Sequence, residues 1–159
     1  MSSKNSKSSK SQKKILIVKL SALGDVVHTL PVPRTLRQEY PDAYIAWMIE
    51  ERYQELLYNN PDIDEIITIR TKVWRKNWNR ETFNEILQII KSLRQKKFDV
   101  VFDFHGLIKS GIIAILSGAK TKVGFHRKNC KEKISSIFTN IKGPYMAGGI
   151  HVVDMYLTL

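Results

Sequence analysis

Residues 15–31, with the sequence ILIVKLSALGDVVHTLP, constrain the fold of this chain more than any other stretch. A short and nearly unbroken apolar run ends at Ser21, and a second apolar-patterned segment follows Asp25. A run this short and this rich in Ile and Val is typical of a strand covered on both faces, as in a parallel sheet. Because ligands bind beyond the carboxyl ends of such strands, we expect Asp25 to lie where chemistry takes place. Gly24 would allow a tight turn there, and Asp25 could cap the helix that follows.

Predicted strands and helices alternate along the rest of the chain. We expect strands at residues 14–20, 43–49, 65–69, 98–104 and 122–125. We expect helices at residues 26–40, 51–59, 81–96 and 107–116, with weaker signals at 134–138 and 151–159. Pro31 and Pro33 predict a kink or a late start near Pro33 in the first of these helices. The alternation predicts an α/β fold with a Rossmann-like parallel sheet and helices on both faces.

The length of 159 residues suits one domain, and the apolar fraction of 43% is enough for a core. We expect a disordered basic Ser/Lys tail at residues 1–13 and a folded domain at 14–159. No apolar run is long enough to span a membrane, and the polar amino terminus does not resemble a secretory signal. Cys130 is the only cysteine, which fits a reducing compartment and makes the cytoplasm the default expectation.

The formal net charge is +11, and five of these charges are lysines in residues 1–14. The folded part is therefore also basic. This excess predicts an anionic partner, which could be a nucleic acid, an anionic lipid or an acidic substrate. The alternative is an ordinary solvated basic surface.

The turn at residues 21–25 is not a nucleotide-binding motif. It has one glycine where a dinucleotide fingerprint needs three, and no Gly-Lys-Ser/Thr follows, so binding of ATP or NAD by this turn is not expected. Asp25 is either a helix cap or a general base toward a hydroxyl nucleophile. Asp62 and Asp64 have the D-x-D spacing of some metal-dependent sugar transferases, but a turn role next to Pro61 competes.

A second informative stretch, residues 70–80, contains five cations and two tryptophans. Arg75 and Lys76 could bind phosphates or carboxylates, and interleaved aromatic residues also suit single-stranded nucleic acid. The alternative is a solvated loop that tryptophan anchors to the core. A further basic cluster includes Lys131. Asp103 and His105 end another apolar strand on the expected ligand side, where a turn or capping role for Asp103 is equally compatible with the sequence.

These stretches together resemble the amino-terminal half of the bacterial lipopolysaccharide core heptosyltransferases of glycosyltransferase family 9. Residues 15–31 resemble the opening strand and S-x-x-G-D signature of that family, and residues 47–51 resemble its second strand. Trp74-Arg75-Lys76 with Trp78 resembles a W-R-K-x-W segment typical of the enzyme that adds the first heptose. Residues 103–110 resemble the D-x-Q-G-L-x-K-S turn, with His105 in place of the usual Gln.

The resemblance implies a two-domain GT-B glycosyltransferase, of which this chain is the amino-terminal acceptor domain without the donor domain. It implies inverting transfer of L-glycero-D-manno-heptose from ADP-heptose to Kdo of Kdo-lipid A, with Asp25 as the general base and no metal or cofactor. The acceptor-binding residues it implies are Ser21, Gly24, Arg75, Lys76, Asp103, His105 and Lys131. It also implies a cytoplasmic protein peripheral to the anionic inner membrane, inactive without a donor domain, and no nucleic acid partner.

Two alternatives from other functional classes stay open at this point. One is a non-catalytic module that binds acidic glycolipid or an anionic membrane surface, and the other is a small single-stranded nucleic-acid binder. If a second domain is absent, residues 152–159 are expected to be poorly packed, with apolar surface around Val153, Tyr156 and Leu157.

Overall fold

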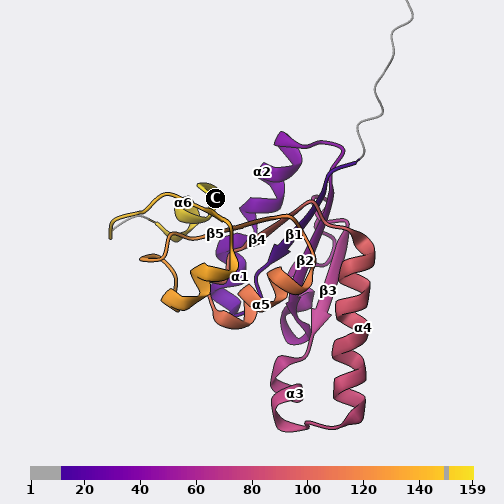
Figure 1. Cartoon of the computed structure of the whole chain (residues 1–159). Helices are drawn as coiled ribbons and strands as arrows, with labels where there is room; N and C mark the ends of the chain where they lie inside the picture. Colours follow the sequence, from indigo (N-terminus) through magenta and orange to yellow (C-terminus); the bar gives the residue numbers. More distant parts are fainter. Residues whose placement is uncertain (1–11, 149–150) are drawn as a thin grey trace, which may run out of the picture.

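The computed structural model describes residues 12–148 and 151–159, and within them one parallel sheet forms the centre of the fold. Its strand order is β3-β2-β1-β4-β5-β6 (Figure 1). The strands are β1 (Lys14–Val18), β2 (Tyr44–Glu50), β3 (Glu65–Ile69), β4 (Val100–Asp103), β5 (Thr121–Gly124) and β6 (Ile141–Lys142). The first strand lies inside the sheet between β2 and β4, as its unbroken apolar sequence predicted.

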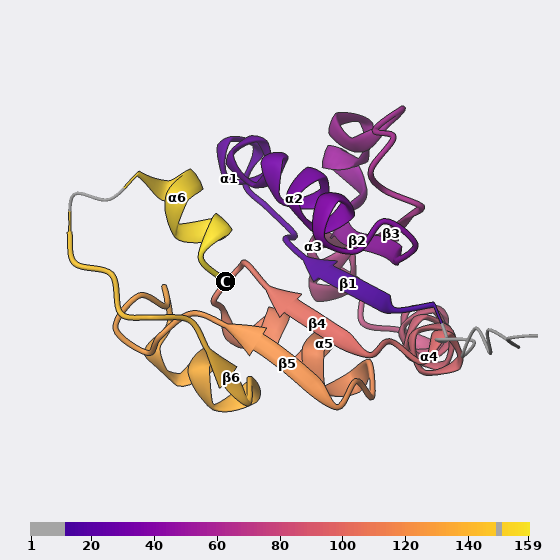
Figure 2. The ribbon, with the colours of Figure 1, turned by 90° about the horizontal axis from the view of Figure 1, so that it is seen from above.

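Helices cover both faces of the sheet. They are α1 (Leu23–Thr29), α2 (Pro31–Glu39), α3 (Thr71–Lys76), α4 (Arg80–Lys96), α5 (Ile108–Leu116) and α6 (Val152–Leu157), with short 3-10 helices η1 (Glu51–Leu57) and η2 (Lys133–Phe138). Figure 2 shows α1, α2 and α6 on one side of the sheet and α4 and α5 on the other. The predicted fold class, a parallel α/β sheet with helices on both faces, is confirmed.

The core consists of two clusters, one on each face. Ile15 and Ile17 of β1 pack on the α1–α2–α6 side, whereas Leu16 and Val18 pack on the α4–α5 side. All four side chains are fully buried. Because successive strand side chains point to opposite faces, a strand with a core on each side needs an apolar residue at every position.

The first predicted helix is divided into two. Helix α1 ends at Thr29, and α2 begins at Pro31, which is its first residue. A proline is tolerated there because the first helical N–H has no partner within the helix. The connection after β3 also differs from the expected loop, since it contains α3.

The carboxyl-terminal segment is better packed than the sequence suggested. The side chain of Tyr156 on α6 is buried against Phe104 and Phe125, and α6 contacts α1 and α2. The expectation of a poorly packed segment was therefore wrong for Tyr156, although Leu157 is exposed. A tyrosine can bury its ring when its hydroxyl finds a polar partner, and here that partner is Lys19.

The expected basic tail at residues 1–13 falls almost wholly outside the described residues, so it stays a prediction. Gln12 and Lys13 precede β1 without regular secondary structure. No helix in the described ranges is long and apolar enough to cross a lipid bilayer.

Candidate active site at the carboxyl edge of the sheet

Side chains from three loops meet where β1, β4 and β5 end. Asp25 lies in the first turn of α1, and its carboxylate accepts a hydrogen bond from Lys131 in the loop after β5. The same carboxylate oxygen lies 3.8 Å from Nζ of Lys19, directly after β1. Asp103 is the last residue of the neighbouring strand β4, and His105 follows that strand. The parallel sheet thus brings together residues more than 100 positions apart in the sequence.

Asp25 does not cap a helix. The N-cap of α1 is Ala22, and Asp25 is the third residue of the helix, with its carboxylate directed at the two lysines rather than at backbone N–H groups. The capping role that the sequence suggested was therefore wrong. Gly24 is also helical, so it serves no turn, and a Cβ placed on it would meet open space.

The pKa of Asp25 lies below its ordinary value. Burial by itself raises that pKa, but the hydrogen bond from Lys131 and the positive charge of Lys19 together outweigh burial. Asp25 is consequently ionised at neutral pH. Its side chain is 26% exposed, so one edge of the carboxylate is accessible from outside.

Lys19 is a site residue that motif analysis missed. Its buried ammonium donates hydrogen bonds of 2.8 Å to the carbonyl oxygen of Phe104 and to the hydroxyl of Tyr156. Burial lowers the pKa of Lys19 to about 8, with the nearby charge of Asp25 opposing the shift. One signal could have found it: a single lysine follows a strand expected to be covered on both faces, and a buried charge requires polar partners.

Asp103 organises the turn after β4. One carboxylate oxygen accepts the backbone N–H groups of His105 at 2.9 Å and Gly106 at 3.1 Å. Burial raises the pKa of Asp103 above its ordinary value, with these hydrogen bonds opposing the shift. In the structure, the buried carboxylate of Asp103 therefore holds the turn, which was one of the two roles compatible with the sequence. Direct contact of Asp103 with an acceptor stays a prediction.

His105 is buried beside the charged groups, and neither ring nitrogen has a hydrogen-bond partner among the described residues. Burial, reinforced by the charges of nearby lysines including Lys19 and Lys131, lowers its pKa to about 3. The imidazole is therefore neutral at pH 7, and it has one donor and one acceptor nitrogen that are unused.

The loop that carries Lys131 is tied to the same turn. The backbone N–H of Glu132 donates a hydrogen bond of 3.1 Å to the carbonyl oxygen of Gly106. The side-chain carboxylate of Glu132 accepts a hydrogen bond of 2.6 Å from the backbone N–H of Ile108. Gly106 has a φ of +65°, a conformation that favours glycine. These contacts place the ammonium of Lys131 at Asp25.

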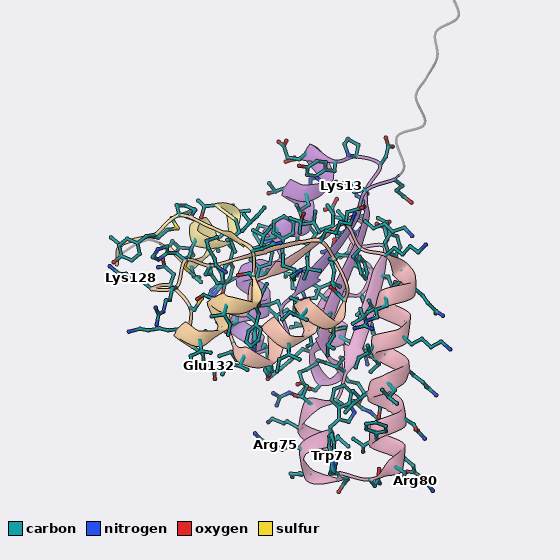
Figure 3. The ribbon with its side chains drawn as sticks, in the orientation of Figure 1. Lys13, Arg75, Trp78, Arg80, Lys128 and Glu132 are labelled. Atoms are coloured by element: carbon teal, nitrogen blue, oxygen red, sulfur yellow. The ribbon has the colours of Figure 1, made fainter. Side chains whose placement is uncertain are left out.

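Arg75 and Lys76 lie farther out. Both belong to the last turn of α3, which follows the carboxyl end of β3, so they share an edge of the sheet with Asp25. The hairpin of α3 and α4 projects beyond that edge, and Figure 3 shows Arg75 near its far end. From the sequence we predict that Arg75 and Lys76 share one concave face with Asp25, because both segments follow the carboxyl ends of strands.

Asp62 and Asp64 form a turn at the opposite edge. Asp62 pairs with Arg34 at 3.4 Å, and Asp64 pairs with Arg37 at 2.8 Å while also accepting the N–H of Ile45. Their carboxylates thus hold arginine side chains and backbone at the start of β3. A surface hollow of about 1310 Å³ likewise lies at this amino edge, around Tyr40 and Phe98. Size alone would favour that hollow, but the buried titratable groups favour the carboxyl edge.

The chain is similar to proteins of one glycosyltransferase family. A family model described as glycosyltransferase family 9 (heptosyltransferase) matches residues 86–159. Lipopolysaccharide heptosyltransferase 1 of Pseudomonas aeruginosa is 31% identical over 142 residues, which cover 89% of this chain and 40% of that protein. The corresponding protein of Escherichia coli K12 is 30% identical over 148 residues, covering 89% of this chain and 44% of the relative.

The fold agrees as well. The solved structure of the E. coli heptosyltransferase WaaC with ADP matches with a TM-score of 0.82 and 29% identity, covering 90% of this chain and 45% of that one. This chain therefore spans less than half the length of the relatives it matches.

Proposed function

We propose that this chain is the acceptor-binding half of a heptosyltransferase I-like enzyme, because a glycosyltransferase family 9 model matches residues 86–159 and the chain is similar to lipopolysaccharide heptosyltransferases. The observation that carries the proposal is the ionised carboxylate of Asp25 between Lys19 and Lys131 at the carboxyl edge of β1. Parallel α/β sheets bind their ligands at this edge.

In the proposed reaction, a hydroxyl of Kdo on Kdo-lipid A attacks the anomeric carbon of ADP-heptose. The new bond forms from the hydroxyl oxygen to that carbon while the bond from carbon to the ADP oxygen breaks, which inverts the configuration. The hydroxyl proton passes to Asp25, and ADP leaves as the anion. Asp25 acts as a general base for this transfer because it is ionised and partly exposed.

Lys131 links acceptor binding to the availability of the base. Its ammonium donates a hydrogen bond to Asp25, and its side chain is 54% exposed. A carboxylate or phosphate of the acceptor would compete for that ammonium. Moving Lys131 to the acceptor would free the Asp25 oxygen for the hydroxyl proton, whereas buried Lys19 would keep Asp25 ionised.

The remaining acceptor residues divide into two groups. Ser21 and Gly24 lie next to Asp25 in the sequence, and Asp103 and His105 belong to the turn after β4, where the sugar would bind. Arg75 and Lys76 would bind phosphate groups farther along the acceptor, since both guanidinium and ammonium groups pair with phosphate. We propose that the donor ADP-heptose binds mainly to a second domain, that transfer needs no metal or other cofactor, and that the protein works at the cytoplasmic face of the inner membrane.

Acceptor binding tests the proposal on the 159-residue chain itself. Calorimetric titration with Kdo-lipid A in neutral detergent micelles is expected to show binding, and lipid A without Kdo is expected to bind more weakly. The double variant Arg75→Ala/Lys76→Ala should weaken binding and reduce its dependence on salt. Equal affinity for lipid A with and without Kdo would overturn the assignment of the sugar site.

Transfer tests the catalytic part and separates it from a non-catalytic binding module. The chain is joined to the carboxyl-terminal half of the E. coli heptosyltransferase, and release of ADP from ADP-heptose is measured with Kdo-lipid A. We expect turnover from the joined protein and none from the 159-residue chain. A joined protein that folds and binds both substrates without turnover would support the binding module instead.

A further inference from the structure

The imidazole of His105 is a buried polar group without a partner. The residue is only 3% exposed, and neither Nδ1 nor Nε2 makes a hydrogen bond within the described ranges. The large majority of buried polar groups in proteins are paired, because a buried group without a partner has lost its hydrogen bonds to water. Two unpaired nitrogens on one ring therefore require a physical explanation.

The backbone of His105 is held on two sides. Asp103 accepts the backbone N–H of His105 at 2.9 Å, which ties this residue to the end of β4. On the other side, the loop after β5 packs on the next residue, because a Cβ added to Gly106 would lie 3.5 Å from Cα of Cys130 and from the backbone N of Lys131. These contacts fix the turn through its backbone and do not use the imidazole nitrogens.

Charged groups near the imidazole determine its protonation state. Three cations and one carboxylate act on His105, and they are Lys19, Lys109, Lys131 and Asp25. Burial and the three cations lower the pKa of His105 to about 3, and the carboxylate opposes this shift only in part. The ring consequently has one N–H donor and one acceptor nitrogen across the whole physiological pH range.

A neutral imidazole discriminates between the kinds of group that it can bind. Its unprotonated nitrogen carries a lone pair that repels the oxygens of a carboxylate or phosphate, so only its N–H can bind an anion. A hydroxyl both donates and accepts, so it can pair with either nitrogen. The neighbouring lysines are the stronger partners for anionic groups. The site therefore offers separate partners for the anions and for the hydroxyls of a ligand.

We propose that His105 is a specificity-determining residue that recognises hydroxyls of the acceptor sugar, with one ring nitrogen donating a hydrogen bond and the other accepting one. The inference rests on the proposed function, because it takes the sugar to bind beside Asp25. It assigns the carboxylate and phosphates of the acceptor to lysines and arginines, and the neutral part of the sugar to the imidazole.

The side chain of Lys131 controls access to the imidazole. It extends from the loop that packs on the turn of His105, and its ammonium reaches Asp25. Because this side chain is 54% exposed, an anionic group of the acceptor can draw it outward. The same movement frees an oxygen of Asp25 and opens space beside His105. Binding of the anion and recognition of the hydroxyls are thereby coupled.

Two substitutions at His105 separate hydrogen bonding from packing. Leucine is similar in size but has no polar atom, so His105→Leu should lower the affinity for Kdo-lipid A in neutral detergent micelles about tenfold or more. Glutamine supplies both a donor and an acceptor, so His105→Gln should stay within about threefold of the wild type. Calorimetric titration measures these affinities. Lipid A without Kdo should bind equally to all three proteins.

The stability of the same variants distinguishes a binding role from a structural one. Replacing an unpaired buried polar group by an apolar one removes a desolvation cost, so His105→Leu should be at least as stable as the wild type in urea. Its advantage should grow as pH falls below 6.5, because His105 then takes up a proton in the unfolded chain and not in the folded protein. A ring that instead holds a buried water would lose stability on substitution.

Ser135→Ala is the matched control. The hydroxyl of Ser135 is also buried and has no partner among the residues that the structure describes, but it belongs to η2, which carries none of the candidate site residues. This variant should bind Kdo-lipid A as the wild type does. Long-range ¹H–¹⁵N NMR gives a direct observation, with the signals of His105 identified by their absence in His105→Gln. They should show a neutral ring at neutral pH and should shift when Kdo-lipid A is added.

Any of three results would overturn the proposal: unchanged affinity or reduced stability in His105→Leu, equal losses of affinity in His105→Leu and His105→Gln, or a protonated ring at neutral pH. Failure of the proposed function has a different signature, since the wild-type chain would then not prefer Kdo-lipid A to lipid A. If the wild type and His105→Leu prefer Kdo-lipid A to the same extent, only the role of His105 is rejected.

Discussion

At the scale of single residues, the surroundings of Asp25 and Asp103 shift the pKa values of these two carboxyl groups in opposite directions. Asp25 and Asp103 lie at the same edge of the sheet, but cations lower the pKa of Asp25 whereas burial raises that of Asp103. Only Asp25 is both ionised and accessible. It is therefore the better candidate for accepting a proton, and Asp103 for holding a turn.

Asp25→Asn tests the role of the base. Asparagine keeps the size of the side chain but cannot take up the proton, so transfer by the joined protein should fall by about 10²–10⁴-fold. Stability should also fall: the exposed pair with Lys131 contributes no more than about 1 kcal/mol, and loss of the charge beside buried Lys19 adds to the cost. Near-normal turnover of Asp25→Asn would place the base elsewhere.

The same variant changes how stability depends on pH. Because the pKa of Asp25 is lowered in the folded state, its stabilising effect is present above its ordinary value and is lost as pH falls through the folded value. Acid unfolding followed by fluorescence should therefore show a smaller loss of stability below about pH 4 in Asp25→Asn than in the wild type.

Lys19→Met addresses the buried cation. The folded-state pKa of about 8 lies below the ordinary 10.5, so the folded protein binds fewer protons than the unfolded chain between these values. The unfolding free energy of the wild type, relative to Lys19→Met, should rise by about 3 kcal/mol as pH increases from 8 to 10.5. Urea unfolding at several pH values measures the difference, and a flat difference would show that Lys19 titrates normally.

At the scale of elements, packing decides where a small residue is required. Gly111 lies within α5, where it faces η2, and a Cβ added there would lie 2.4 Å from a ring carbon of Phe138. Glycine inside a helix usually costs about 0.5–1 kcal/mol relative to alanine. The close approach of η2 therefore outweighs the ordinary preference of the helix.

Gly111→Ala should consequently destabilise the protein. Overpacking of about 1–3 kcal/mol exceeds the gain in helix propensity, so the net loss is expected to be about 1–2 kcal/mol in thermal unfolding. Gly24→Ala is a control in another helix, because its Cβ would meet open space, and its stability should be unchanged or slightly higher. If Gly111→Ala also stabilises, the contact between α5 and η2 is looser than the structure shows.

Prediction of the elements from sequence succeeded where neighbouring residues suffice. The strand at residues 65–69 was predicted residue for residue, and the helix at 81–96 differs by one residue from α4. The break at Leu30 was placed only approximately, because a proline is unfavourable in a helix interior but acceptable as the first helical residue. The short strand β6 was missed, since two exposed residues carry no periodic signal.

At the scale of the whole molecule, the last helix completes the site that the first strand begins. The hydroxyl of Tyr156 accepts a hydrogen bond from Lys19, 137 residues earlier in the sequence, and its ring packs on Phe104. Burial raises the pKa of Tyr156 above its ordinary value, so the hydroxyl stays protonated near neutral pH. The ends of the described chain are thereby joined through the candidate site.

Tyr156→Phe tests this long-range contact while keeping the ring. The substitution removes one hydrogen-bond acceptor of the buried Lys19 ammonium. The free energy of unfolding, measured with denaturant, should therefore fall by about 1.5–3 kcal/mol. The pKa of Lys19 should fall further, which the pH dependence of stability would report. An unchanged free energy of unfolding would mean that water replaces the hydroxyl.

The sequence by itself determined the architecture and one edge of the site. Apolar residues at every position of residues 15–18 required a strand with a core on each face, and such a strand places Asp25 at the carboxyl edge whatever its partners are. The proposed contacts of Arg75 and Lys76 with an acceptor rest on the sequence alone.

Only the tertiary structure decided which groups surround Asp25. Lys131 reaches Asp25 because parallel pairing brings the loops after β1, β4 and β5 together. Lys19 remains charged inside the protein because the carbonyl of Phe104 and the hydroxyl of Tyr156 accept hydrogen bonds from its ammonium. No local pattern encodes these partners, since each depends on a pairing of distant segments. The ionisation of Asp25 and the neutrality of His105 follow from that three-dimensional arrangement of charge and burial.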